Sequence, residues 1–228
     1  MNSTKPQTPA PKYLKDYKAP DHLIPKVDLH FNLDDTQTLV RARLQIERAN
    51  PAADRLVLDC QVDKLVSVKV DGRLLSPEEY QVSDEALMIP AELDAFLLET
   101  ESLVDPANNT SLEGLYKSAG VYCTQCEAEG FRKITPFLDR PDVLSVYTVT
   151  IYADKDRYPY LLSNGNKLDS GELDEGELDE GETNCAWVKW QDPNPKPSYL
   201  FALVAGDFDL LTDSYTTTSG RDVELELF

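Results

Sequence analysis

Apolar and polar residues alternate along much of this chain. Apolar side chains occupy every second position from Val27 to Leu33 and again from Val40 to Ile46. A period of two gives each segment one buried and one solvated face, which predicts antiparallel β-strands. The apolar run Val66–Val70 ends at Asp71-Gly72, two residues that tolerate positive φ, so a hairpin should return through Leu74 and Leu75.

The same pattern predicts several more short strands, and no long helical periodicity interrupts them. The stretch from Pro141 to Ser145 could form a single helical turn, since proline suits the first position of a helix. Many short strands separated by turns predict an all-β fold, an antiparallel β-sandwich or saddle. The other predicted strands are Ala86–Ile89, Phe96–Val104, Tyr147–Ala153, Tyr160–Ser163, Ala186–Gln191, Tyr199–Ala205 and Val223–Leu227.

Two segments depart from this pattern. Residues 1–20 are proline-rich and are predicted to form an extended arm along the domain. Residues 167–184 contain a repeated Gly-Glu-Leu-Asp-Glu unit and are predicted to form an acidic, solvated hairpin loop. Calcium binding is an alternative for the acidic repeat, although it lacks the order of ligands found in an EF-hand.

Composition narrows the possible partners. The formal net charge is −19 and the pI is about 4.4, so nucleic acids and anionic membrane surfaces, which bind basic proteins, are not expected partners. The stretch from Met1 to Lys18 has no apolar signal region, and no segment approaches the roughly 20 apolar residues of a membrane span. We therefore expect a cytoplasmic protein.

The four cysteines are too few for a disulfide framework, and reduced thiols are expected. Cys123 and Cys126 have the C-x-x-C spacing of some metal and redox sites. A zinc site needs further ligands, and a thioredoxin-type site needs a helix N-terminus in a βαβ unit, which the pattern does not predict. A metal or redox protein nevertheless remains one alternative.

The segment from Ser111 to Val143 resembles zinc aminopeptidases of the aminopeptidase N family, and the similarity extends through Leu161–Asn166 and Trp190–Asp209 to nearly the whole chain. The amino-acid sequences of these segments resemble those of the bacterial branch of that family. The motifs that carry the resemblance are Gly114-Leu115-Tyr116, Thr124-Gln125-Cys126-Glu127, Arg132 and Asp139-Arg140-Pro141.

The resemblance implies that Gln125 and Glu127 line the pocket for the first residue of a peptide substrate. A carboxylate in a partly desolvated pocket binds a free α-ammonium through a charge-assisted hydrogen bond. The amide of Gln125 can offer its oxygen to the same ammonium or its NH2 group to the substrate backbone. Arg132 and Asp139 are predicted to form a structural ion pair or to brace a turn, because no nucleophile or metal ligand accompanies them.

The residues that hold zinc in this family are not found in this sequence. The family's His-Glu-x-x-His motif places two histidines four residues apart on a helix, whereas His22 and His30 are eight residues apart. We therefore expect no catalytic or metal residue in this chain. Residues 1–206 are predicted to be the N-terminal β-domain, and residues 207–228 the first strands of a truncated thermolysin-like catalytic domain.

The resemblance further implies a parent enzyme that uses one zinc ion to remove an N-terminal residue, often alanine, from peptides. Its partners would be peptide N-termini and the rest of the parent chain, and the fragment alone should be inactive. The alternative is a stand-alone β-sandwich interaction module without catalytic activity. The alternation of Val223–Leu227, which stops at Phe228, argues against that module, because an apolar edge would stay exposed.

Overall fold

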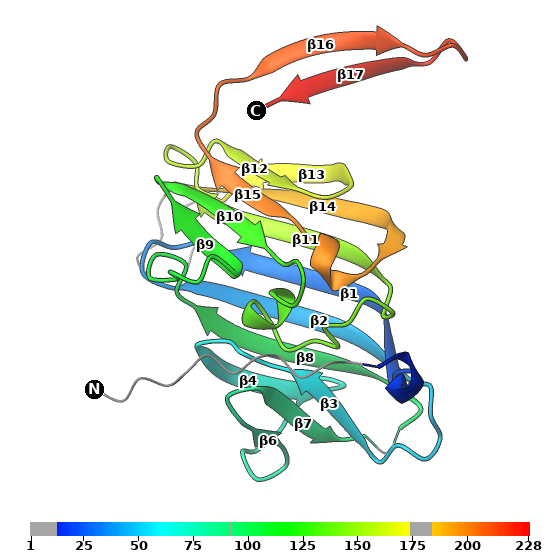
Figure 1. Ribbon diagram of the computed structural model, residues 1–228. Coiled ribbons are helices and arrows are strands. Elements are labelled where there is room, and N and C mark those ends of the chain that lie inside the picture. Colours follow the sequence, from blue (N-terminus) through cyan, green and yellow to red (C-terminus); the bar gives the residue numbers. More distant parts are fainter. Residues whose placement is uncertain (1–12, 92, 174–183) are drawn as a thin grey trace.

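The computed structural model describes residues 13–91, 93–173 and 184–228, and it is built almost entirely of strands (Figure 1). An eight-stranded sheet forms its base, in the order β13-β14-β11-β1-β2-β8-β4-β5. The bounds in that order are Asn166–Glu172, Cys185–Lys196, Ser145–Asp154, His22–Asn32, Thr38–Arg48, Ala95–Val104, Lys64–Val70 and Arg73–Leu74. This architecture confirms the predicted all-β class.

Two smaller sheets lie side by side over one face of the large sheet, and a two-stranded hairpin projects beyond one end (Figure 1). The four-stranded sheet contains β12 (Tyr160–Ser163), β15 (Leu203–Gly206), β10 (Val121–Gln125) and β9 (Gly114–Ser118). The three-stranded sheet contains β3 (Arg55–Asp59), β7 (Ala86–Pro90) and β6 (Gln81–Val82). The projecting hairpin contains β16 (Leu211–Thr216) and β17 (Asp222–Leu227), and three short 3₁₀ helices are η1 (Leu14–Asp16), η2 (Phe131–Lys133) and η3 (Ser198–Leu200).

Alternation along the strands separates a dry face of the large sheet from a wet one. Val27, Leu29 and Phe31 of β1 are at most 2% exposed, because they point toward the smaller sheets. The other face carries charged pairs across strands, such as Arg41 and Glu101, which lie opposite each other on β2 and β8 with 3.2 Å between Nε and Oε1. Apolar burial therefore occurs on one face only, as expected of a sheet with one solvated side.

Aromatic rings fill the space between the layers. Phe131 of η2 is fully buried and packs edge-on against Phe137, with 4.9 Å between ring centroids, and against Phe201 at 5.3 Å. Tyr147 of β11 completes the cluster from the large sheet. Such pairs contribute about 0.5–1.5 kcal/mol each beyond their area burial, so this cluster stabilises the contact between layers.

A polar cluster around Asp35 joins three parts of the chain. The carboxylate of Asp35 accepts hydrogen bonds from Lys117 Nζ at 2.5 Å, from Tyr158 Oη at 3.0 Å and from Arg157. Burial alone would raise the pKa of Asp35, but these three donors outweigh burial and hold the pKa well below its usual range. The cluster ties the β1–β2 turn to β9 and to the β11–β12 connection.

Three predictions about local structure are corrected. Strands β1 and β11 run parallel, although only antiparallel neighbours were expected, because alternation along a strand carries no information about the direction of its neighbour. The stretch Pro141–Ser145 is a turn, closed by Val143 N donating to Arg140 O, and Ser145 already begins β11. The predicted strand Tyr199–Ala205 begins with η3, because Phe201 N bonds Ser198 O, and becomes extended only at Leu203.

The structure describes only parts of the two segments that depart from the alternating pattern, residues 1–20 and 167–184. The predicted loop 167–184 is wrong in its first part, since β13 extends to Glu172 and pairs with β14, while residues 174–183 lie outside the described residues. Residues 13–20 of the predicted arm lie against the 140–142 turn, where Arg140 Nη2 donates to Lys18 O at 2.7 Å.

No helix in the described ranges is long and apolar enough to cross a membrane. β15 ends at Gly206, and the assignment of the following hairpin to a catalytic domain stays a prediction.

The burial of His22 predicts a pH-dependent stability. His22 is 2% exposed, and its Nε2 has no hydrogen-bond partner among the residues that the structure describes. Burial lowers its pKa from 6.5, Arg48 adds to this and Asp21 opposes it. The unfolded chain therefore binds the proton first as the pH falls, so stability declines below pH 6.5 and levels off below the folded pKa.

We expect His22→Leu to flatten the fall in unfolding free energy between about pH 7 and about pH 5, measured by urea denaturation. The control is His30→Leu, because His30 lies on the same strand, is about one-third exposed and pairs with Asp28 at 3.2 Å. An unchanged pH dependence in His22→Leu would contradict the prediction.

Candidate functional site

The predicted site residues, Gln125 and Glu127, lie at the end of a tight hairpin formed by β9 and β10 and just after it. Its turn is Ala119-Gly120, and both residues have positive φ, 49° and 88°, the conformation of a type I′ turn. The sequence interpretation did not predict these two strands. The signal was present, since glycine at the turn is flanked by aromatic and β-branched residues at Tyr116, Val121 and Tyr122.

At Thr124 the regular pairing of β10 with β15 ends, while pairing with β9 continues through Gln125. The β10–β15 ladder is formed by Tyr122 with Ala205 and Cys123 with Val204. At the next step the Thr124 hydroxyl accepts a hydrogen bond from Leu203 N at 2.8 Å and donates to Leu203 O at 3.3 Å. The Thr124 side chain thus satisfies the backbone N–H and C=O of Leu203. The backbone of β10 does not have to pair with β15 at this position and can turn away from it.

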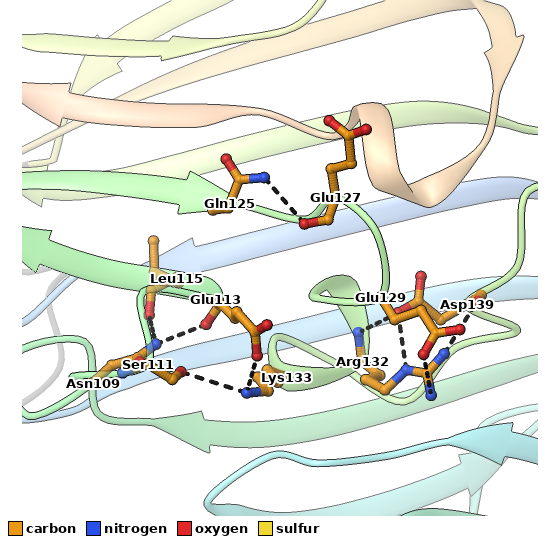
Figure 2. A network of polar contacts seen from close by, with 10 residues as sticks. All are labelled: Asn109, Ser111, Glu113, Leu115, Gln125, Glu127, Glu129, Arg132, Lys133 and Asp139. Atoms are coloured by element: carbon orange, nitrogen blue, oxygen red, sulfur yellow. Dashed lines mark hydrogen bonds and ion pairs between the residues drawn. The ribbon is translucent and has the colours of Figure 1, made fainter. Parts of the chain in front are cut away.

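Gln125 and Glu127 are brought together at this exit. Gln125 Nε2 donates to the backbone oxygen of Glu127 at 3.2 Å. Both side chains are exposed, and the Glu127 carboxylate has no hydrogen bond or ion pair with the residues that the structure describes. Figure 2 shows this carboxylate pointing away from the polar cluster around Arg132. In this chain the carboxylate is therefore open to an external cation.

The predicted ion pair of Arg132 and Asp139 is confirmed, and it is larger than expected. The Asp139 side chain is 1% exposed, and its Oδ2 accepts from the Arg132 backbone N at 3.2 Å and from Arg132 Nε at 3.1 Å. Arg132 Nη2 also donates to the Asp139 backbone oxygen at 3.0 Å. Ser198 Oγ donates to the remaining carboxylate oxygen at 2.6 Å, so the buried charge is fully compensated.

The same arginine reaches two further carboxylates that sequence reasoning did not connect with it. Its Nη1 lies 3.3 Å from Asp59 Oδ1 on β3. The same atom lies 3.8 Å from Glu129 Oε2, a contact drawn in Figure 2. Burial raises the pKa of Asp59, and Arg132 opposes that rise. Of the three carboxylates between residues 126 and 139, Glu129 and Asp139 are paired with Arg132, and Glu127 is left open.

The surroundings of Cys123 and Cys126 do not favour the alternative of a metal or redox protein. Cys123 and Cys126 are free thiols, and Cys126 is 2% exposed. Burial raises the pKa of both thiols, and the nearby Asp139 raises that of Cys126 further. A raised pKa keeps a thiol protonated, whereas redox and metal-binding cysteines need the thiolate.

The described residues do not fit a zinc site. No group of three or more His, Cys, Asp or Glu side chains in the described ranges is arranged to hold a metal ion. His22 and His30 lie on one strand, where eight residues span about 26 Å. One hollow of about 560 Å³ in the described part of the chain is lined by residues such as Asp63, Asp105 and Lys133, and its lining includes neither Gln125 nor Glu127.

The hydrogen bonds of Thr124 predict a specific effect on stability. In Thr124→Val the Leu203 backbone groups lose their partner, and we expect a loss of about 1–3 kcal/mol in the free energy of unfolding, measured by urea denaturation. Thr124→Ser keeps the hydroxyl and should retain most of the stability. Equal stabilities of the valine and serine variants would contradict this role.

The sequence matches a known family along most of its length. The family model described as the Peptidase M1 N-terminal domain matches residues 25–200. Aminopeptidase N of Haemophilus influenzae is 50% identical over 220 residues, which are 95% of this chain and 24% of that protein. Aminopeptidase N of Escherichia coli K12 is 49% identical over 222 residues, 97% of this chain and 24% of that protein. The chain thus spans about a quarter of the length of these relatives.

Solved structures show the same fold. Aminopeptidase A of Legionella pneumophila, in complex with aspartic acid, superposes with a TM-score of 0.84 at 36% identity over 94% of this chain and 25% of that one. An M1 zinc metallopeptidase of Deinococcus radiodurans superposes with a TM-score of 0.72 over 90% of this chain and 47% of that one, but at 15% identity it supports the fold alone. On the family match, the chain belongs to the Peptidase M1 N-terminal domain family.

Proposed function

We propose that this chain is the N-terminal domain of a zinc aminopeptidase and that Glu127 and Gln125 recognise the free α-amine of the substrate. The names of its relatives and the quarter of their length that it spans support a larger parent enzyme. The observation that carries the proposal is the exposed carboxylate of Glu127, which pairs with none of the described residues, whereas Glu129 in the same loop and Asp139 are both paired with Arg132.

The arrangement suits an ammonium group. A carboxylate binds an ammonium through a charge-assisted hydrogen bond, which is stronger than a bond between neutral groups. The amide nitrogen of Gln125 is engaged with the backbone of Glu127, which leaves the amide oxygen as a second acceptor. An internal peptide bond has no ammonium and would leave Glu127 without its partner, so the site would select chain ends.

Hydrolysis itself is assigned to the part of the parent that this chain does not include. The matching family model is that of a peptidase domain and the curated relatives are aminopeptidases, which supports a hydrolytic parent. We propose that the zinc ligands lie in the downstream chain, that this chain alone is inactive, and that the parent prefers alanine-like N-terminal residues. A cytoplasmic location remains part of the same proposal.

The first test compares this chain with a form extended by the downstream residues of its own gene, each assayed on an alanine chromogenic amide with added zinc. We expect activity only in the extended form. There, Glu127→Ala should lower kcat/KM by about tenfold to a hundredfold, as expected for the loss of a hydrogen bond to a charged group.

The matched control is Glu78→Ala, which removes an exposed carboxylate from another sheet connection and should leave kcat/KM unchanged. A Glu127→Ala enzyme as active as the wild type would overturn the assignment of amine recognition to this residue.

The projecting hairpin supports the rest of the parent chain as a partner. Leu211 pairs with Leu227, and Tyr215 with Val223, so these side chains share one face. Leu211, Tyr215 and Leu227 are 65%, 56% and 58% exposed, whereas the opposite face carries Thr, Ser, Asp and Glu. An apolar face left open in this way favours a fragment over a stand-alone module.

We expect the isolated chain to self-associate through this face, as measured by sedimentation velocity. The double variant Leu211→Thr, Leu227→Thr should shift it toward monomer, because the apolar contact area is lost. The control Thr212→Ala alters the polar face and should have no effect. A monomeric wild-type chain would instead favour the stand-alone module.

A further inference from the structure

We propose that Arg132 is a positioning residue for Glu127, which it serves by fixing the loop 126–130 and by keeping Glu129 paired. The inference rests on the proposed function, because it assigns a role within the same amine-recognition site. Arg132 does not contact the substrate in this scheme and acts only through the loop.

The loop has little internal structure of its own. Two hydrogen bonds in and beside it are Gly130 N donating to Cys126 O at 2.9 Å and Gln125 Nε2 donating to Glu127 O at 3.2 Å. Glu127, Ala128 and Glu129 are all exposed. The direction of the Glu127 carboxylate therefore depends on how firmly the two ends of the loop are held.

The first end is held by burial of Cys126 at the exit from β10. The second end is η2, where Phe131 is fully buried and Arg132 follows it. Arg132 donates three hydrogen bonds to Asp139, and its backbone oxygen accepts from Gln61 N at 2.9 Å. This end of the loop is thus fastened to the β3 region and, through Asp139, to Ser198 of η3.

The guanidinium also acts on the charge inside the loop. Its Nη1 is 3.8 Å from the carboxylate of Glu129, two residues from Glu127. Arg132 therefore holds a carboxylate inside the loop as well as the end of the loop. The planar fork of arginine makes these contacts at once, which a lysine ammonium cannot do.

The test is a double-mutant cycle in the extended, zinc-loaded chain, with kcat/KM on the alanine amide as the readout. Arg132→Gln should lower kcat/KM about tenfold in the wild-type background, because small displacements of a positioning group are costly. In the Glu127→Ala background the same substitution should change kcat/KM by less than about twofold, since the group it positions is already missing. A merely structural arginine would lower kcat/KM by the same factor in both backgrounds, and that result would overturn the inference.

Two further variants guard against a folding defect. Arg132→Lys keeps the charge and should restore part of kcat/KM. If Arg132→Gln does not fold, as judged by thermal unfolding, Asp59→Asn removes one contact of Arg132 and takes its place in the cycle with the same expected non-additivity. The matched control is Arg48→Gln, because Arg48 pairs with Asp94, is 17% exposed against 15% for Arg132, and lies away from the loop.

The outcomes separate the two proposals. If Glu127→Ala leaves kcat/KM unchanged, amine recognition by Glu127 fails and the positioning role fails with it. If Glu127→Ala lowers kcat/KM but Arg132→Gln does not, or lowers it equally in both backgrounds, amine recognition stands and only the role of Arg132 is wrong.

Discussion

The arrangement of the loops between the layers depends on one buried carboxylate. Asp139 is almost fully removed from water, and an unpaired charge in such a place would cost several kcal/mol. It is tolerated because Arg132 and Ser198 donate to both of its oxygens. Since these donors come from distant parts of the chain, satisfying this single charge fixes η2 and η3 relative to each other, and the Asp139 backbone N ties both to Asp59 of β3.

The two small sheets lie on the same face of the larger sheet, and the chain around η2 packs between the layers. The aromatic cluster around Phe131 fills the apolar interior there, and the contacts of Arg132 satisfy the polar groups beside it. The loop 126–130 has buried ends, Cys126 and Gly130, and exposed residues between them. In the proposed function, this arrangement presents the carboxylate of Glu127 to a ligand while the ends of the loop stay anchored.

Much of the fold followed from local patterns. Alternating residues identified β1, β2 and β8, and Asp71-Gly72 identified the β4–β5 hairpin. Patterns failed where long-range partners decide the structure. β13 is highly polar and pairs only through its backbone with β14, and the chain from Ser198 to Leu200 curls into η3, where Ser198 meets Asp139. The residues Gln125 and Glu127 came from a family resemblance, since an exposed carboxylate in so acidic a chain has no local signal.

The sequence by itself determined the all-β class through alternation, and its motifs indicated the family and a structural role for Arg132 and Asp139. Only the tertiary structure decided that these two side chains pair, that Asp59 and Glu129 share the same guanidinium and that Glu127 does not. The contact between Arg132 and Asp59 needs a distance of a few ångströms between segments far apart in the chain, and the contact with Glu129 depends on how the loop turns into η2. Those distances are set by the packing of the sheets and loops, which no single segment encodes.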